Sequence, residues 1–327
     1  MNVLYTCDDN YVWIMGISVI SLFENNRHIR DLSVILLGEC ISDYNKSVLE
    51  NIANKYKRKI HIFDVPGFDI PSALMSTRWP LSAFTRLFSG QLLPDSMKKV
   101  LYLDCDTIIR GNIDTLDCLK FDGNILLGVK DCISGKYKEN IGLNKKSIYI
   151  NAGVILFDLV ELRKIDVSRA IEIYLNKYLK AINYADQDIL NGIFKGKIGE
   201  LEPVYDVMTI NAVYSYEEIL QLRRPTNFYS KKELSKAVQN PVIIHYTTNM
   251  LVVRPWFLND NHPLSEEFRK YMDISPWRKK NMELLIFDSR EAKIITLINK
   301  LPKCMAYRIL GLIHSELKPI YIRMKAR

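Results

Sequence analysis

The chain has 327 residues, of which 48% are hydrophobic and 25% are charged. This composition is typical of globular proteins and excludes a chain that is mainly disordered. No run of about 18 uncharged apolar residues is present to cross a bilayer, and the first ten residues lack a basic segment followed by an apolar one. We therefore expect a cytoplasmic protein with a sizeable core.

The six cysteines are spread along the chain without a CxxC pair. This spacing argues against a zinc ribbon or a disulfide framework and predicts free thiols in a reducing compartment. Cys7 and Cys105 each end an apolar run, so we expect them to pack in the core or to line a site.

Almost all of the net charge of +8 lies in the last 36 residues, which hold eight basic residues and one acidic residue, Glu316. We therefore divide the chain into a main domain, residues 1–280, and a basic tail, residues 281–327. Basic residues flank two apolar stripes in the tail, which predict two amphipathic helices. The stripes consist of Ile294, Ile295, Ile298 and Leu301, and of Met305, Ile309, Leu312 and Ile313.

The tail has two interpretations. Its helices could dock on the main domain and leave a solvated face, or they could lie on an anionic membrane, where each cation contributes about 1 kcal/mol. Because apolar and basic residues coincide, we expect a peripheral protein at the inner face of the plasma membrane. We expect no nucleic-acid partner.

Short β-branched runs alternate with helical patterns in the first half of the chain. This order predicts an α/β domain with a mostly parallel sheet. The predicted strands are residues 2–5, 32–37, 60–63, 99–103, 148–157 and 240–246. The predicted helices are residues 11–24, a segment that Ser42 caps, residues 82–92, and a segment that Asp186 caps.

Two acidic residues follow the strand in the segment KKVLYLDCDTIIRGNID. Asp104 and Asp106 come directly after residues 99–103, and open α/β sheets bind ligands at such strand ends. Two carboxylates spaced in this way can hold a divalent cation, and a nucleoside diphosphate can complete its coordination shell. A turn with a helix cap is the alternative interpretation of the same residues.

The same segment also resembles the first motif of haloacid-dehalogenase-type phosphohydrolases. In such an enzyme Asp104 would be the nucleophile and Asp106 the general acid. That motif opens the domain of its family, whereas about a hundred residues of α/β pattern precede it here. We keep this enzyme class as an alternative.

A polar turn, TCDDNYV, follows the first strand at residues 6–12. Asp8, Asp9 and Asn10 offer hydrogen-bonding groups, and Tyr11 offers an aromatic face. A uracil ring needs partners at its edge and a surface on which to stack, so the turn suits a nucleoside. By itself, the turn could equally be a helix N-cap with a surface tyrosine.

A histidine ends the late strand in the segment HYTTNMLVVRPW at residues 245–256. Imidazole is a good ligand for Mn²⁺, and the guanidinium of Arg254 can bind a phosphate with two hydrogen bonds. A lone histidine would more often be structural. His245 gains significance because the acidic strand end and the nucleoside-type turn occur in the same chain.

Taken together and in this order, these motifs resemble glycosyltransferase family 8, which contains lipopolysaccharide galactosyltransferases and glucosyltransferases and glycogenin. The resemblance covers roughly residues 1–260. It rests on YTCDDNY, FTRL at 84–87, YLDCDTI, NAGVILFDL at 151–159, YADQDILN at 184–191, and HY followed by RPW. In the last segment Arg254 replaces the family's usual lysine, and Thr248 or Asn249 replaces a glycine.

The resemblance implies a GT-A fold, a retaining hexosyltransferase, a UDP-glucose or UDP-galactose donor, and Mn²⁺, or else Mg²⁺, as cofactor. It implies a saccharide or glycolipid acceptor from a cell-surface glycan. Asp104, Asp106 and His245 would bind the metal. Asp8, Asn10 and Tyr11 would hold the uridine, Arg86 would contact the donor sugar and the phosphate side, and Arg254 would contact the diphosphate. The residues that would line the sugar pocket are Asp131, Asn151, Ala152, Asp186 and Gln187. Thr6 and Cys105 are further implied donor-site residues.

The family's mechanism implies that Gln187 lies beneath the anomeric carbon. An amide is a poor nucleophile, so we expect front-face displacement, in which His245 and Arg254 support the departing diphosphate. Asp131, Asp186 and Asp188 leave a double displacement open, although we expect them to orient other groups. An inactive sugar-nucleotide-binding protein remains a further alternative, and residues 200–240 give no signature for the acceptor.

Overall fold

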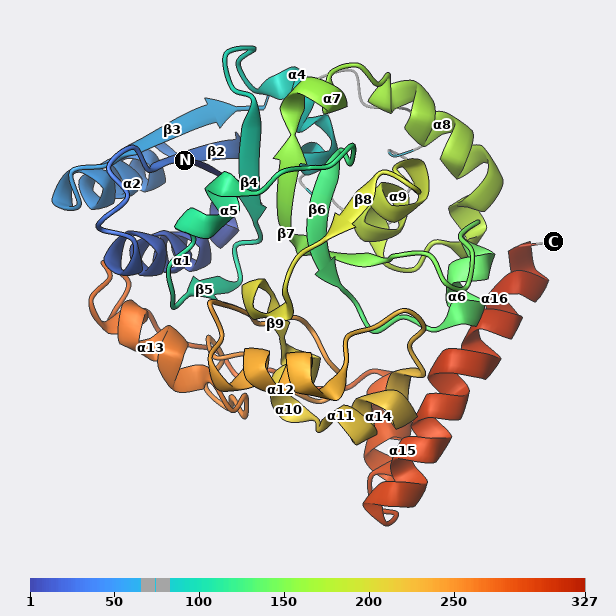
Figure 1. The fold of residues 1–327 in the computed structure, drawn as a ribbon. Helices are drawn as coiled ribbons and strands as arrows, with labels where there is room; N and C mark the ends of the chain where they lie inside the picture. Colours follow the sequence, from blue (N-terminus) through green and yellow to red (C-terminus); the bar gives the residue numbers. More distant parts are fainter. Residues whose placement is uncertain (66–73, 75–82, 327) are drawn as a thin grey trace.

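The computed structural model describes residues 1–65, 74 and 83–326. Within this part of the chain, seven strands form the main sheet, and all except β7 run in the same direction (Figure 1). The sheet order is β3 (Lys59–Asp64), β2 (Ser33–Glu39), β1 (Asn2–Asp8), β4 (Lys99–Leu103), β7 (Ile150–Asp158), β6 (Leu126–Lys130) and β8 (Ile198–Glu200). The predicted, mostly parallel α/β sheet is confirmed.

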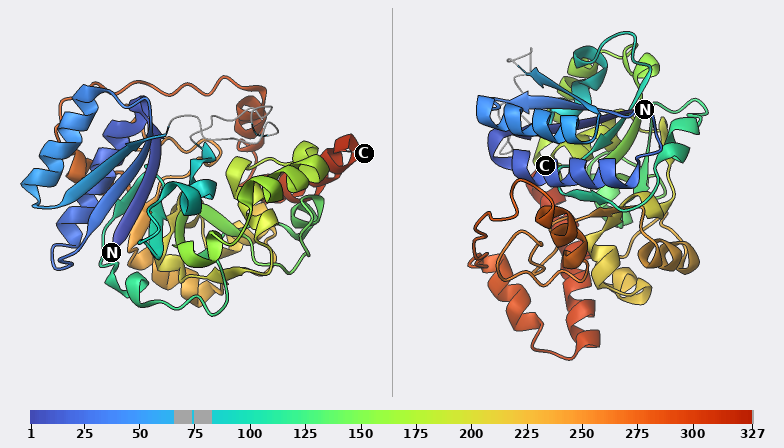
Figure 2. Two further views of the ribbon diagram at one scale, coloured as in Figure 1. Left: turned by 90° about the horizontal axis from the view of Figure 1, so that it is seen from above. Right: turned by 90° about the vertical axis from the view of Figure 1, so that its left-hand side faces the viewer.

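Helices cover both faces of this sheet, because successive residues of a strand point to opposite sides. In β1, Val3 and Tyr5 belong to one core cluster, whereas Leu4 belongs to the other. The helices of the two layers can be followed in Figure 2. The first layer contains α1 (Val12–Asn25), α2 (Asp43–Lys55) and α13 (Ser265–Asp273), and the second contains α4 (Ser89–Leu92), α7 (Leu159–Leu162), α8 (Val167–Tyr178) and α9 (Ala185–Ile193).

A second, three-stranded sheet brings the late histidine to the acidic strand end. It consists of β5 (Thr107–Ile109), β10 (Ile243–His245) and β9 (Val207–Met208) among the described residues. His245 pairs with Thr107 in the antiparallel register of β10 and β5. The backbone amide of Tyr246 also donates to the carbonyl of Asp106 at 2.9 Å. These backbone contacts place His245 beside residues that lie about 140 positions earlier.

Five further helices of the described residues lie between β5 and β10 in the sequence. They are α5 (Asp114–Cys118), α6 (Gly135–Asn140), α10 (Thr209–Val213), α11 (Tyr216–Arg223) and α12 (Lys231–Gln239). Short 3₁₀ turns join several of the other elements, including Asp9–Tyr11 before α1. All six cysteines are free thiols, as predicted.

Two sequence predictions need correction. Residues 82–92 do not form one helix, because the described part consists of a 3₁₀ turn, Thr85–Phe88, followed by α4; Ser82 lies outside the described residues. Asp186 does not cap α9 but lies within its first turn. The backbone amides of Asn183 and Tyr184, just before this helix, donate instead to the carboxylate of Asp188, each at 2.8 Å.

Some observed strand boundaries differ from the predicted ones. The strand at 99–103 is confirmed without change. The first strand continues past residue 5 to Asp8, and the strand predicted at 240–246 shortens to Ile243–His245. Ser42 caps α2 as predicted, accepting a hydrogen bond from the backbone amide of Asn45.

The basic tail folds back onto the main domain. It contains α14 (Arg290–Ile298), α15 (Lys303–Leu312), a π-helical turn (Ile313–Leu317) and α16 (Lys318–Ala326), drawn in orange to red in Figure 1. The side chains that remain exposed include Leu297, Met305 and Met324. Among the described residues, no helix is both long and apolar enough to span a membrane.

Specific hydrogen bonds and close packing hold the tail against α6 and α11. The Ser315 hydroxyl donates to the carbonyl of Arg223 at 2.7 Å, and the Asn140 amide donates to the carbonyl of Pro319 at 2.7 Å. A Cβ atom at Gly311 would lie 1.9 Å from the carbonyl oxygen of Gln221. Only glycine therefore allows α15 to approach α11 this closely.

We predict that Gly311→Ala loosens the tail. The added methyl group meets backbone, which cannot rotate away, and overpacking of this kind costs about 1–3 kcal/mol. In hydrogen exchange, the amides of α15 and α16 should exchange at least tenfold faster, whereas those of β1 and β4 should not change. Leu312→Ala, on the exposed side of the same helix, is the control. Unchanged exchange in the Gly311 variant would contradict this packing.

Candidate active site

Two carboxylates and one imidazole converge where β4 ends and β10 ends. His245 Nε2 lies 3.2 Å from Asp106 Oδ1 and 3.6 Å from Asp104 Oδ2. One ligand atom from each of the three residues falls within 4.8 Å of the others. The three residues predicted from separate motifs are thus close enough to share one cation.

A glycine on β7 makes room for this cluster. A Cβ atom at Gly153 would lie 2.1 Å from His245 Cε1 and 2.9 Å from Asp104 Oδ2. The Gly153 carbonyl also accepts a hydrogen bond from the Asp104 amide at 2.8 Å. Any larger residue here would displace the imidazole or the carboxylate. This glycine lies in the motif NAGVILFDL, whose local pattern predicts no role for it.

A fourth acidic residue, which the sequence analysis missed, orients the histidine. Asp206 is fully buried, and its Oδ1 lies 2.9 Å from His245 Nδ1. This contact leaves Nε2 directed at Asp104 and Asp106. Burial lowers the pKa of His245, but the carboxylates of Asp206 and Asp106 outweigh burial and raise the pKa well above its usual value. Asp206 carries no local motif that could have revealed it.

The buried side chain of Arg86 contacts three other groups. Its Nη1 donates to Asp104 Oδ1 at 2.7 Å and to the carbonyl of Ala152 at 2.8 Å. Its Nε lies 3.1 Å from Asp186 Oδ2, within ion-pair distance. The Tyr102 hydroxyl also donates to Asp104 Oδ1 at 2.7 Å. Because Oδ1 is occupied by protein donors, Asp104 presents its other oxygen, Oδ2, to His245.

These contacts shift the ionisation of the buried acids in opposite directions. Burial raises the pKa of Asp186 to about 6, since it outweighs the favourable charge of Arg86, and Asp104 adds to the increase. Burial also acts to raise the pKa of Asp106, but His245 and Arg254 outweigh it and lower this pKa. Arg254 Nη1 lies 3.5 Å from Asp106 Oδ2. Arg254 therefore belongs to the same site.

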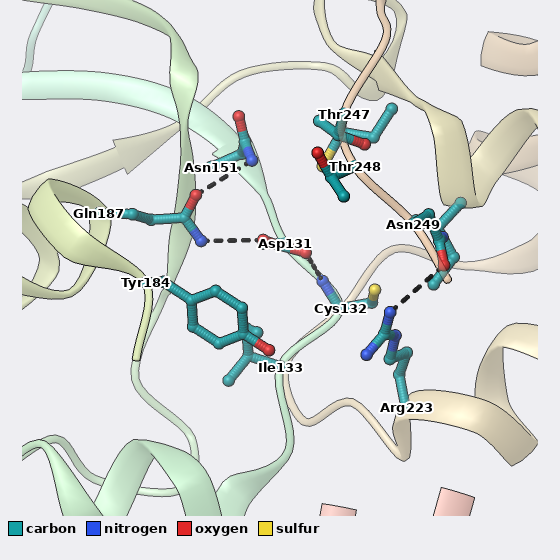
Figure 3. Close-up of a pocket in the computed structure, with 12 residues that line it drawn as sticks. Asp131, Cys132, Ile133, Asn151, Tyr184, Gln187, Arg223, Thr247, Thr248 and Asn249 are labelled. Carbon is teal, nitrogen blue, oxygen red and sulfur yellow. Dashed lines mark hydrogen bonds between the residues drawn. The ribbon is translucent and has the colours of Figure 1, made fainter. Parts of the chain in front are cut away.

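The side-chain amide of Gln187 is held in one orientation (Figure 3). Its oxygen accepts hydrogen bonds from Asn151 Nδ2 at 3.0 Å and from the Ala152 amide at 3.2 Å. Its nitrogen donates to Asp131 Oδ2 at 2.9 Å and lies 3.2 Å from the Tyr149 hydroxyl. Both lone-pair directions of the amide oxygen are engaged, which makes this oxygen a poor nucleophile.

Asp188, one residue further along α9, has a structural role. It is fully buried and accepts hydrogen bonds from the hydroxyls of Tyr137 at 2.5 Å and Tyr149 at 2.7 Å. The two backbone amides before α9 donate to Oδ2, the oxygen that Tyr137 also bonds. Four protein donors thus hold this carboxylate, so it orients its neighbours rather than attacking a substrate.

The nucleoside-type turn opens beside the same cluster. A pocket of about 320 Å³ is lined by Thr6, Cys7, Asp8, Tyr11, Ala83, Arg86, Asp104, Cys105 and Asp106. Asn10, within this turn, is exposed, and Tyr11 keeps 39% of its surface exposed. Asp9 instead accepts hydrogen bonds from the Ser42 amide at 2.8 Å and Asn45 Nδ2 at 2.7 Å. Asp9 therefore ties the turn to α2.

A second pocket, of about 160 Å³, lies beside Gln187 (Figure 3). Its lining includes Asp131, Asn151, Gln187, Tyr184 and Arg223. The loop 247–249 closes it. Thr248 and Asn249, which stand where the family has a glycine, thus line this pocket. Arg223 Nη2 contacts Asn249 Oδ1 at 3.5 Å.

We predict a specific pH dependence of stability from Asp186. Its pKa of about 6 in the folded protein exceeds the usual 3.8, so the folded state binds the extra proton between these values. Relative to Asp186→Asn, the wild-type protein should lose about 2–3 kcal/mol of unfolding free energy as the pH rises from 4 to 6.5. Above pH 7 the difference should stay constant. Urea unfolding of both proteins at each pH checks this, and a pH-independent difference would contradict it.

Comparisons with known proteins identify one family. The family model Glycosyl transferase family 8 matches residues 2–260. General stress protein A of Bacillus subtilis is 25% identical over 280 residues, covering 85% of this chain and 94% of that protein. Lipopolysaccharide 1,2-glucosyltransferase of Escherichia coli K12 is 26% identical over 282 residues, covering 85% and 79% respectively.

Solved structures agree on the fold. A crystal structure of the galactosyltransferase LgtC in complex with donor and acceptor sugar analogues superimposes with a TM-score of 0.71. The two chains are 22% identical, and the match covers 86% of this chain and all of the other. The predicted GT-A fold is confirmed. The family match also removes the phosphohydrolase alternative. With most of its length matched, this chain belongs to glycosyl transferase family 8 and is a glycosyltransferase.

Proposed function

We propose that the protein transfers glucose or galactose from a UDP-sugar to a saccharide acceptor of a cell-surface glycan, with retention of the anomeric configuration. The observation that carries this proposal is the convergence of Asp104, Asp106 and His245 beside the pocket of the nucleoside-type turn. A cation and a nucleoside diphosphate would then occupy adjoining positions.

The donor set fits a divalent cation, and Mn²⁺ better than Mg²⁺. Mn²⁺ accepts both imidazole nitrogen and carboxylate oxygen, whereas Mg²⁺ prefers oxygen alone. Asp206 directs His245 Nε2 toward Asp104 and Asp106, and Gly153 leaves the space that the imidazole needs. A cation held by these residues would supply positive charge to the diphosphate.

The remaining residues of the first pocket suit a UDP group. Tyr11 offers a partly exposed ring for the uracil, and Asp8 and Asn10 offer polar groups for the base and ribose. Arg254, next to Asp106, would contact the diphosphate, since its guanidinium is only partly buried. Arg86 is buried and paired with Asp104 and Asp186, so it would act mainly by positioning these carboxylates.

In the proposed reaction, the bond between the anomeric carbon and the phosphate oxygen breaks, and its electron pair leaves with UDP. The acceptor hydroxyl forms the new bond on the same face, and its proton passes to the departing phosphate. Gln187 would lie beneath the anomeric carbon. Its doubly engaged amide oxygen supports front-face displacement over a covalent intermediate. Asp131, bonded to Gln187, would orient sugar hydroxyls.

The choice between glucose and galactose rests on one hydroxyl group. The relatives include a glucosyltransferase and a galactosyltransferase by name, so they support a hexose without choosing between the two. Incubation with each UDP-sugar, followed by measurement of released UDP, separates them.

We predict that Asp106→Asn removes metal-dependent UDP binding while the protein stays folded. Loss of one charged ligand should weaken UDP binding in the presence of Mn²⁺ at least tenfold and lower transfer at least a hundredfold. Titration calorimetry with UDP, with and without Mn²⁺, measures the first effect. Asp104→Asn should behave in the same way, and Asp122→Asn, on an exposed turn, is the control. Near-normal metal-dependent binding in the Asp106 variant would refute the site.

We also propose that the tail rests on an anionic membrane surface. The support is the coincidence of exposed apolar residues with basic ones, including Leu297 and Met305 beside Lys300 and Lys303. Apolar side chains there would enter the interface while the lysines contact anionic headgroups. This arrangement would bring the enzyme to a membrane-bound glycan acceptor.

Reversing the charge of two tail lysines tests the proposed membrane contact. Lys300→Glu combined with Lys303→Glu should lower the affinity for phosphatidylserine-containing vesicles at least tenfold, because each lost cation removes about 1 kcal/mol. Lys59→Glu combined with Lys120→Glu changes the net charge equally outside the tail and should have much less effect. Co-sedimentation with the vesicles measures both. An equal loss in the two double variants would rule out the tail as the contact.

A further inference from the structure

A large apolar cavity lies between the tail and the main domain. Its volume of about 580 Å³ exceeds those of the two pockets described above. Most of its apolar lining comes from the tail. The apolar tail residues that line it are Phe287, Ala292, Ile294, Ile295, Leu310 and Ile313. A cavity of this size and character is typical of sites that bind a small apolar molecule or part of one.

This tail cavity adjoins the second pocket of the active site. Tyr184, Arg223 and Thr248 line both spaces. The second pocket also contains Asp131 and Gln187, beside which the anomeric carbon would lie in the proposed reaction. A sugar seated beside Gln187 would therefore have the tail cavity as its neighbour across three shared side chains.

The tail itself holds the shared wall in position. His314 Nε2 lies 3.2 Å from the Tyr184 hydroxyl and is hydrogen-bonded to Arg223. Burial, and then the charge of Arg223, lowers the pKa of His314 to about 2, so the ring is neutral and accepts the hydrogen bond from the guanidinium. The tail is thus part of the wall between the two spaces.

The chemistry of the lining decides what the cavity can bind. A free sugar carries hydroxyls on every side and needs many hydrogen-bonding partners. Among the described lining residues, those that line only the tail cavity and carry strongly polar groups are Ser289, Glu291, His314 and Lys318, and His314 is already engaged by Tyr184 and Arg223. The aliphatic and aromatic residues suit an alkyl or aryl group instead.

We propose that the tail completes the acceptor site and that the acceptor is amphiphilic. This proposal rests on the proposed function. Its sugar end would lie beside Gln187, and the apolar group attached to that sugar would occupy the tail cavity. The acceptor class would then be a sugar linked to a lipid or another apolar group, rather than a free oligosaccharide.

Paired glucosides test this proposal directly. Octyl β-D-glucoside, below its micelle concentration, should bind the full chain in the presence of Mn²⁺ and UDP at least tenfold more tightly than methyl β-D-glucoside, as measured by titration calorimetry. Ile295→Glu, which places a charge in the cavity, should abolish this preference. Leu297→Glu adds the same charge to the exposed side of the same helix and should preserve it.

A second variant covers the case in which Ile295→Glu fails to fold. Ala292→Leu fills the cavity with an apolar group and should lower octyl glucoside affinity while leaving methyl glucoside affinity unchanged. Equal affinity of the two glucosides for the wild-type protein would overturn the proposal, as would loss of the preference in Leu297→Glu. UDP binding, measured in every variant, separates this result from the proposed function, because failure of that function would appear as absent metal-dependent UDP binding.

Discussion

The crowding of carboxylates at the end of β4 is the constraint on which the rest of the site depends. Asp104, Asp106, Asp186 and Asp206 are all largely buried there, where uncompensated negative charge is unfavourable. The cationic and imidazole groups that face them are Arg86, Arg254 and His245. Each carboxylate has at least one oxygen held by such a neighbour, and Asp106 has both oxygens in contact with one, His245 on Oδ1 and Arg254 on Oδ2. The proposed cation would complete this balance of charge.

Two pockets adjoin the site, and the proposed reaction assigns the first to the donor and the second to the acceptor. Tyr11, Arg86 and Asp106 line the first pocket, and Asp131 and Gln187 line the second. Gln187 is held through both ends of its amide. In the proposed reaction this fixed side chain would help to hold the anomeric carbon in place while its bond to UDP is replaced by a bond to the acceptor. The tail borders the second pocket, so the part of the chain that we propose to contact a membrane adjoins the proposed acceptor position.

Local sequence determined the strand ends and the polar turn. Residues 99–103 form a strand as predicted because their apolar run suits a buried central position. Asp104 and Asp106 then had to emerge at a sheet edge, and Asp8 and Tyr11 had to follow the neighbouring strand β1. Six motifs in order were sufficient to indicate the family. Two helices of the tail were also evident from periodicity, whereas a third, α16, was not predicted.

Only the tertiary structure assigned partners to these side chains. Asp206 has no motif around it and orients His245 solely because β9 and β10 pair. Asp186 looked like a helix cap, but Arg86 draws it into an ion pair, and Asp188 receives the amides that a cap would have taken. Gly153 and Gly311 are needed because a Cβ atom at either position would clash with a residue far away in the sequence. The sequence by itself determined which chemical groups leave each strand and helix, because that depends on short-range periodicity. Which groups meet depends on contacts between distant segments, and no local pattern encodes those.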